Sequence, residues 1–290
     1  MGEDQGKWLK GMIEEFVKGS PENSLRMEPD EKAFDEVLVG FSAGDDPLYE
    51  TYKDVVGALH WTPLEAFSLG FPETTAKAGE LSVISWILPQ RAATRRDNRR
   101  EKFYPSRRWV QARFPGEEFN NSLRRHVVAE LGKKGVKAVA PVLLPEWKWD
   151  KSEKYVLVSN WSERHAAYAS GLGTFGLCDG LITEKGKAHR AGSVVARIAV
   201  PPTPRPYADH HAYCLFFQGG SCTACQKRCP VGAVTEKGHD KMKCLEHAGG
   251  TCGRFVKENY GFDGYGCGLC QTGVPCESGI PKKILKAKAK

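Results

Sequence analysis

The sequence predicts a mixed α/β (α+β) protein in two parts, an α/β domain over residues 1–200 and a cysteine-rich domain over residues 201–290. Helical and strand-like patterns alternate through the first 200 residues, and 41% of the 290 residues are hydrophobic, which is enough for a sizeable core. The segment PPTPRP at 201–206 breaks regular structure, because proline fixes φ and lacks an N–H donor. Nine of the ten cysteines follow that segment, which therefore marks the predicted boundary.

The first 150 residues contain four readable elements. Apolar residues three or four apart over 8–17 predict a packed helix. The run LSVISWIL at 81–88, closed by Pro89, predicts a buried strand. The segment FNNSLRRHVVAELGKKG at 119–135 predicts a helix with an Asn or Ser cap, and VKAVAPVLL at 136–144 predicts a strand after it.

The second half of the α/β part is organised around a glycine-rich loop. YVLVSNW at 155–161 predicts a strand, and Ser162 can cap a helix over 162–170 that leads into GLGTFGLCDG at 171–180. The segments LIT at 181–183 and GSVVARIAV at 192–200 predict two strands that pair with each other.

Localisation follows from what the sequence lacks. No stretch approaches the roughly 18 apolar residues of a membrane span, and the N-terminus is too polar for a signal peptide. We therefore expect a cytoplasmic protein with no membrane partner. The reducing cytoplasm leaves thiols free for metal binding or catalysis.

The richest basic stretch is RAATRRDNRREKFYPSRR at 91–108. It holds Arg95, Arg96, Arg99, Arg100, Lys102, Arg107 and Arg108. They can bind the phosphates of RNA or the propionate and phosphate groups of a cofactor, or they can belong to a solvated loop. The formal net charge of +7 falls to about +3 if two iron–sulfur clusters are bound, so overall basicity argues only weakly for nucleic acid.

The cysteine spacing predicts two [4Fe–4S] clusters. Cys222-x2-Cys225-x3-Cys229-Pro230 carries most of a bacterial ferredoxin run, in which the cysteine before proline reaches a second cluster. The first cysteine of that run is replaced by Gly219, so Cys214 is assigned its role. Crossed ligation gives the first cluster Cys214, Cys222, Cys225 and Cys276, and the second cluster Cys229, Cys244, Cys267 and Cys270.

Two cysteines remain outside these sets. Cys252 can replace Cys244 if the loop runs differently. Cys178 lies near the glycine loop, where it can touch a ligand or serve as a buried packing residue, which is the commoner role of a lone cytosolic cysteine. A zinc site with four cysteine ligands is the alternative for two Cys-x2-Cys pairs. Pro230 and the additional thiols at ferredoxin-like positions favour iron.

Residues 80–280 resemble the epoxyqueuosine reductase family, which shares its architecture with respiratory reductive dehalogenases. Glu163-Arg164, GLGTFG (171–176), GLIT (180–183) and GSVV (192–195), in this order ahead of the cysteines, carry the resemblance. It implies a nitroreductase-like cobalamin-binding domain followed by a bacterial ferredoxin-like domain with two [4Fe–4S] clusters. It also implies an oxidoreductase whose clusters pass single electrons from a soluble ferredoxin- or flavodoxin-type donor to a base-off corrinoid.

The resemblance implies a corrinoid pocket near the glycine loop. Its residues would be Ser159, Gly171, Gly173, Thr174, Phe175, Gly176, Gly180, Leu181 and Ser193. Glycines suit this role because they let the backbone approach a flat ligand. The alternative for Gly171 and Gly173 is an ordinary helix C-cap and turn.

The chain departs from the family at the catalytic acid. The family's aspartate falls on Leu157 in an ungapped comparison or on Ser159 after a two-residue shift, and neither side chain can act as the acid. The proton donor is therefore unknown. The neighbouring candidates are Tyr155, Glu163, His165 and Tyr168.

Three functions remain open from the sequence. The first is a cobalamin-dependent reductase of an unidentified small-molecule substrate. The second is an iron–sulfur electron-transfer protein that reduces or activates a partner's corrinoid or metal centre. The third is a tRNA-modifying enzyme, which requires the basic segment between Arg95 and Arg108 to contact RNA.

Overall fold

A computed structural model describes residues 2–154, 156–220 and 222–288 of the protein. The helices of the α/β part are α1 (Gly2–Gly19), α2 (Leu48–Val55), α3 (Pro63–Gly70), α4 (Ala92–Arg100), α5 (Arg107–Arg113), α6 (Pro115–Lys133) and α7 (Glu163–Ala169), with 3₁₀ turns η1 (Ala78–Glu80) and η2 (Pro141–Leu143). Its strands are β1 (Leu38–Ala43), β2 (Ser82–Pro89), β3 (Ala138–Val139), β4 (Trp149–Ser152), β5 (Val156–Ser159), β6 (Gly173–Phe175), β7 (Leu181–Thr183) and β8 (His189–Ala196). The cysteine-rich part holds α8 (Ala224–Arg228), β9 (Val234–Thr235), β10 (Gly238–His239), α9 (Lys241–Leu245), the π-helical turn η3 (Glu246–Thr251), α10 (Cys252–Tyr260), the 3₁₀ turn η4 (Leu269–Gln271) and α11 (Lys282–Lys288). The mixed α/β class is confirmed.

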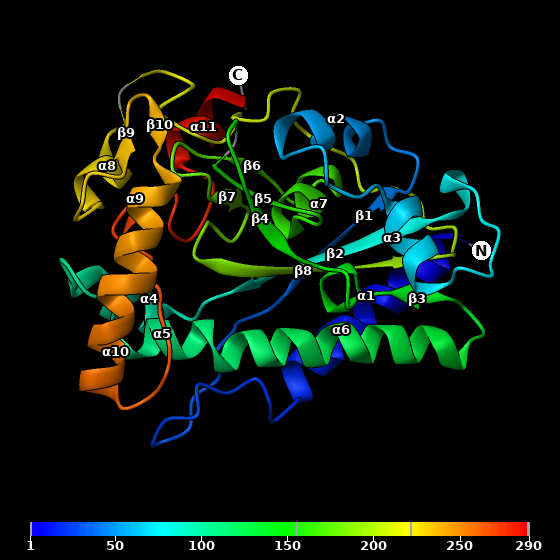
Figure 1. Ribbon diagram of the computed structural model, residues 1–290, viewed down its shortest axis with the longest axis horizontal. Helices are drawn as coiled ribbons and strands as arrows, with labels where there is room; N and C mark the ends of the chain where they lie inside the picture. The colour runs from blue at the N-terminus through cyan, green and yellow to red at the C-terminus, as the bar shows by residue number, and fades with distance from the viewer. Residues whose placement is uncertain (1, 155, 221, 289–290) are drawn as a thin grey trace.

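The core of the α/β part is a four-stranded antiparallel sheet in the order β1-β2-β8-β3 (Figure 1). One face of this sheet packs against α1 and α6. Ile84, Trp86 and Leu88 alternate along β2 toward this face, as strand geometry requires, and meet Leu9 and Ile13 of α1. The helix predicted at 8–17 and the buried strand predicted at 81–88 are both confirmed.

The opposite face of the sheet packs against α2, α3 and α7. Val83 and Ile87 of β2 point to this side and join Tyr49, Phe67 and Ala167 in a second apolar cluster. Because α7 lies on this face, the glycine loop that follows it emerges at the edge of the sheet near the cysteine-rich part (Figure 1).

Three local predictions are wrong in detail. The helix expected from residue 119 begins at Pro115, since proline at the first helical position lacks only an N–H that would have no partner. The strand expected over 136–144 ends after two residues, because a 3₁₀ turn begins at Pro141. The segments 181–183 and 192–200 do not pair with each other: β7 pairs with β6, and β8 pairs with β2 and β3.

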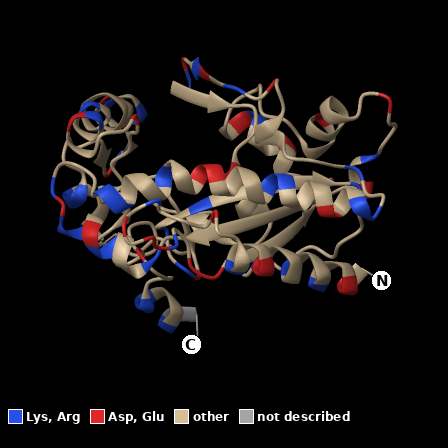
Figure 2. Ribbon diagram, turned by 90° about the horizontal axis from the view of Figure 1, so that it is seen from below, with Lys and Arg blue, Asp and Glu red and all other residues tan. Residues whose placement is uncertain are grey.

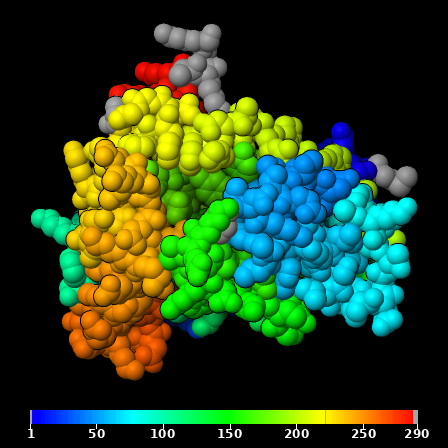
Figure 3. Space-filling view, turned by 45° about the horizontal axis from the view of Figure 1, so that its top comes forward, coloured from blue at the N-terminus to red at the C-terminus, as the bar shows by residue number. Residues whose placement is uncertain are grey.

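The cysteine-rich part packs against one end of the α/β part. In the space-filling view its yellow-to-red residues form one side of the molecule (Figure 3). An apolar cluster joins the two parts, with Leu177 and Ile182 from the glycine-loop region packed among Tyr213, Val234 and Val274. The loop that carries the family motif therefore lies directly against the cysteines.

The segment at 201–206 has no regular secondary structure. It runs beside β1, where the Thr203 N–H donates to the Phe41 carbonyl over 2.9 Å. The domain boundary placed there stays a prediction. Among the described residues no helix has the length and apolar character needed to cross a membrane.

The basic segment at 91–108 contains α4, the loop at 101–106 and the start of α5, and Arg96, Arg100 and Lys102 are exposed, so the choice between a phosphate-binding and a solvated segment stays open. Lys and Arg gather at this end of the molecule (Figure 2). Arg99 Nη2 lies 2.5 Å from Glu277 Oε1, directly after Cys276 in the chain. Arg108 lies 2.5 Å from both Glu31 and Asp97. Part of this charge therefore holds the cysteine-rich part and α5 in place.

Candidate functional site

A cavity between the glycine loop and the cysteine-rich part is lined by four thiols. They are the four predicted ligands of the first cluster, Cys214, Cys222, Cys225 and Cys276. Gly176, Leu177 and Lys187 from the α/β part also line it. Thiols from separate segments of the chain thus share one space, and thiolates are the ligands that iron–sulfur clusters use.

Cys178 lies beside this cavity. It is buried, as a packing residue would be, and its thiol lies near the thiols of Cys225 and Cys270. Lys187 Nζ donates to Cys178 Sγ over 3.2 Å. The pKa of Cys178 lies well below its usual range, and the thiols of Cys225 and Cys270 make the largest contribution to this shift. Lys187 was missed from the sequence, because GKAHR reads as a polar turn.

A second group of thiols surrounds the start of α10. The Cys252 thiol lies near that of Cys267, and its Sγ lies 3.4 Å from His247 Nε2. Cys244 belongs to the same neighbourhood and lies near His239. Cys252 and Cys244 therefore lie near each other, and the choice between them as ligand stays open.

The other two predicted ligands of the second cluster are Cys270 and Cys229. The Cys178 thiol, burial and the Cys267 thiol raise the pKa of Cys270 well above its usual range, so Cys270 lies near a member of each group. Cys229 Sγ accepts a hydrogen bond of 3.1 Å from the Ala233 N–H, and such bonds to sulfur help to set cluster potentials. In residues 2–154, 156–220 and 222–288, no three Cys, His, Asp or Glu side chains are grouped to hold a single metal ion.

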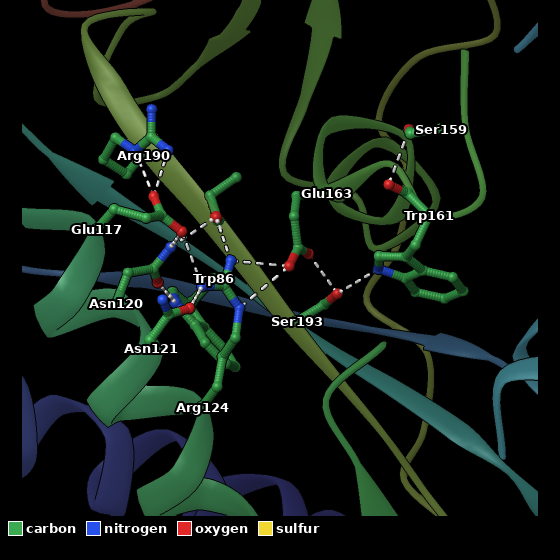
Figure 4. A network of polar contacts seen from close by, with 11 residues as sticks. Trp86, Glu117, Asn120, Asn121, Arg124, Ser159, Trp161, Glu163, Arg190 and Ser193 are labelled. Atoms are coloured by element: carbon green, nitrogen blue, oxygen red, sulfur yellow. Dashed lines mark hydrogen bonds and ion pairs between the residues drawn. The ribbon is translucent and has the colours of Figure 1, made fainter. Parts of the chain in front are cut away.

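Glu163 and Ser193, predicted for catalysis and for the corrinoid pocket, belong to a buried polar network (Figure 4). The Arg124 side chain is 1% exposed and lies 2.8 Å from Glu163 and 2.9 Å from Glu117. The Ser193 hydroxyl donates to Glu163 and accepts from Trp161 Nε1 over 3.0 Å. Burial raises the pKa of Glu163. This network ties α7 to β8 and α6, and no pattern in the sequence pointed to Arg124 as its centre.

The glycines of the loop make close approaches to the chain itself. Gly171 follows α7 with φ of +76°, and a Cβ there would lie 2.7 Å from the Pro204 carbonyl oxygen. A Cβ on Gly173 would lie 2.3 Å from the Ile182 oxygen on the paired strand. The helix C-cap alternative therefore describes Gly171, whereas Gly173 is part of a strand and Gly176 borders the thiol cavity.

The other predicted pocket residues lie around this loop. Thr174 is buried and its Oγ1 accepts the Tyr213 N–H over 2.9 Å. Leu181 is buried in the second apolar cluster, and Gly180 accepts the Gly176 N–H over 2.9 Å. The corrinoid role of this set stays a prediction.

Two of the remaining acid candidates, His165 and Tyr168, lie on α7. The Phe175 ring packs against His165 and Tyr168, with ring centroids 4.7 and 5.7 Å apart. Ser159 Oγ donates to the Trp161 carbonyl over 3.0 Å. Tyr155 lies outside the described residues.

His60 is a buried histidine that orients the start of α7. Its Nε2 accepts the Ser162 N–H over 3.2 Å, its ring stacks on Trp161, and it is 2% exposed. Burial lowers the pKa of His60 to about 4 from an ordinary value of 6.5. Between these values the unfolded chain binds a proton that the folded chain does not, so acid destabilises the fold.

We therefore expect His60 to account for a loss of about 2 kcal/mol in the free energy of unfolding between pH 7 and pH 5. Urea unfolding of the wild type and His60→Gln at both pH values measures it. Glutamine keeps an acceptor but does not titrate, so the variant should lose less stability. Equal losses in the two proteins would contradict the assignment.

Comparison with known proteins identifies relatives of one kind. No protein-family model matches the chain. A segment of 125 residues is 34% identical to the epoxyqueuosine reductase of Bacillus anthracis and 33% identical to that of Bacillus cereus, covering 41% of this chain and 30% of each relative. Among solved structures, an epoxyqueuosine reductase superposes with a TM-score of 0.48 at 18% identity, over 95% of this chain and 67% of that one. A catabolic reductive dehalogenase superposes with a TM-score of 0.49 at 14% identity, over 87% of this chain and 31% of that one. Over the matched segment the chain is a relative of the epoxyqueuosine reductases, and the resemblance predicted from the sequence is confirmed.

Proposed function

We propose that the chain is a cytoplasmic, cobalamin-dependent oxidoreductase in which two [4Fe–4S] clusters deliver single electrons to a base-off corrinoid. The observation that supports this most directly is the cavity where four cysteine thiols face Gly176 and Leu177. Those two residues belong to the loop whose motif carries the family resemblance. In this proposal the first cluster and the corrinoid-binding loop therefore border the same cavity.

The residues present fit the first cluster by their chemistry. Cys214, Cys222, Cys225 and Cys276 are free thiols around one cavity, which matches the four-cysteine ligation of a [4Fe–4S] cluster. The second cluster would be held around α9 and α10, with Cys244 or Cys252 beside Cys267.

The clusters supply one-electron chemistry when bound, and cobalamin supplies the reactive metal. The chain's own contribution is ligation, exclusion of water and orientation of the loop. Leu177, Ile182 and Val274 close the thiol cavity with apolar side chains, which limits solvent access. The buried network around Arg124 fixes α7, from which the loop departs.

The proposal leaves the substrate unidentified. Leu157 and Ser159 occupy the positions that match the family's acid, and both lie on β5. Reduction of epoxyqueuosine by the family's route would need an acid from elsewhere. The electron source in the proposal is a soluble ferredoxin- or flavodoxin-type protein.

Anaerobic purification with iron counting and cobalamin titration tests this function. We expect about eight irons per chain, four for each cluster, and saturable cobalamin binding followed by its absorption spectrum. Reduction of bound cobalamin should require the clusters, so a cluster-free preparation that binds cobalamin should leave it oxidised when the protein donor is added.

The electron-transfer and zinc alternatives each have their own outcome in that experiment. If the protein holds about eight irons but does not bind cobalamin, it is instead an electron-transfer protein that acts on a partner's corrinoid or metal centre. A preparation that holds zinc and no iron would remove both functions.

A further inference from the structure

Lys187 is a buried cation among thiols. It is 3% exposed and lines the same cavity as Cys214, Cys222, Cys225 and Cys276. Its ammonium donates to Cys178 Sγ over 3.2 Å. Lysine is rarely buried to this degree unless an anion compensates its charge.

The fold holds Lys187 close to the predicted ligands. The Lys187 N–H donates to the Cys276 carbonyl over 2.9 Å, which joins the turn before β8 to the cysteine loop. Gly186 makes this approach possible, because a Cβ there would lie 2.2 Å from the Glu277 oxygen and its φ is +84°. The backbone at Lys187 is thus held directly against the loop that carries Cys276.

The groups that interact with the Lys187 ammonium are cysteine thiols. In the part of the chain that the structure describes, no carboxylate forms an ion pair with Lys187, and its hydrogen-bond acceptor is Cys178. The other groups that act on it electrostatically are the thiols of Cys276, Cys270 and Cys225. Burying an ammonium costs several kcal/mol, so this site requires a negative partner.

We propose that Lys187 is the buried counter-charge of the first cluster and raises its reduction potential. A [4Fe–4S] cluster on four thiolates carries roughly −2, and this charge grows by one when the cluster takes up one electron. A fixed ammonium nearby stabilises the more negative reduced form. The ammonium keeps its proton in both states, and the electron comes from the low-potential soluble donor. This inference rests on the cluster part of the proposed function and is independent of cobalamin.

Potentiometric titration of the reconstituted protein, followed by electron paramagnetic resonance of each reduced cluster, tests it. Lys187→Met removes the charge and keeps the length. We expect the one-electron reduction of one cluster to become at least about tenfold less favourable, a shift of about 59 mV, with the other cluster unchanged. Lys187→Arg should stay near the wild type. Lys185→Met is the matched control, because Lys185 is two residues away, pairs with Glu36 and is 42% exposed.

The outcomes separate this inference from the proposed function. Unchanged midpoints of both clusters in Lys187→Met at full iron content would overturn it. Loss of one cluster in Lys187→Met but not in Lys187→Arg supports the counter-charge, whereas loss in both shows a structural role and overturns it. A wild type without iron would defeat the proposed clusters themselves, and a wild type with clusters but no cobalamin affinity would defeat only the corrinoid part.

Discussion

Replacing Arg124 with alanine is expected to lower the free energy of unfolding by about 3–5 kcal/mol, because it leaves a buried carboxylate without its cation. Arg124 lies between Glu117 and Glu163 with its side chain 1% exposed. Glu117 keeps a second partner in Arg190, so Glu163 loses the most. Urea unfolding at pH 7 measures the change.

The pH dependence of this variant follows from Glu163. Burial already raises the pKa of Glu163, and removing Arg124 raises it further. A protonated Glu163 needs no cation, so the destabilisation by Arg124→Ala should shrink as pH falls. The double variant Arg124→Ala/Glu163→Gln should be more stable than the sum of the single changes predicts.

Lys133→Ala is the matched control for Arg124. Lys133 lies on the same helix and pairs with Glu130 at 2.5 Å, but its side chain is 70% exposed. Exposed pairs contribute about 0–1 kcal/mol, so this variant should unfold almost as the wild type does. If the two variants lost similar amounts of stability, the buried network would not hold α7 in place.

The elements that the sequence predicted well are those set by local pattern. The apolar residues at 8–17 recur with the spacing of a helix, and 81–88 is an apolar run typical of a buried strand. These two segments form α1 and β2. Helix α7 begins after Ser162 as expected. Strand pairing was missed for β7, because GLIT and GSVV are close in sequence whereas the partner of β7 lies on the other side, in β6.

The buried charges could not be predicted, because their environment comes from distant segments. Lys187 stands in a polar stretch, TEKGKAHR, and is buried only where Cys276 and Glu277 cover it. Arg124 looks like a surface residue of an amphipathic helix until Glu163 from α7 meets it. Periodicity in a single sequence indicates which face of a helix or strand is apolar. It does not indicate which charged side chain will be buried by an element later in the chain.

The cysteine spacing grouped four thiols that share one cavity, but it did not place Cys178 beside them. Cys214, Cys222, Cys225 and Cys276 line one cavity. Cys178 joins that group from the α/β part through the fold, not through any spacing. A ferredoxin-like pattern fixes the order of thiols along the chain, whereas the loop geometry between them decides which thiols meet.

Cys276→Ser is expected to remove the cluster held by Cys222 and Cys225 and to leave the other one, although Cys276 follows Cys267 and Cys270 in sequence. The reason is that Cys276 lines the same cavity as Cys222 and Cys225. About four of about eight irons should remain, with one set of cluster signals lost in the Mössbauer and paramagnetic resonance spectra.

Double variants decide whether ligation is crossed. If Cys276 and Cys222 hold the same cluster, Cys222→Ser/Cys276→Ser should retain about four irons, as each single variant does. Cys267→Ser/Cys276→Ser should then lose nearly all iron, because it damages both clusters. The reverse pattern would assign Cys276 to the cluster of its own loop. In that case the first cluster would need a different fourth thiolate, and Cys178, which already contacts Cys225, is the one in place to supply it.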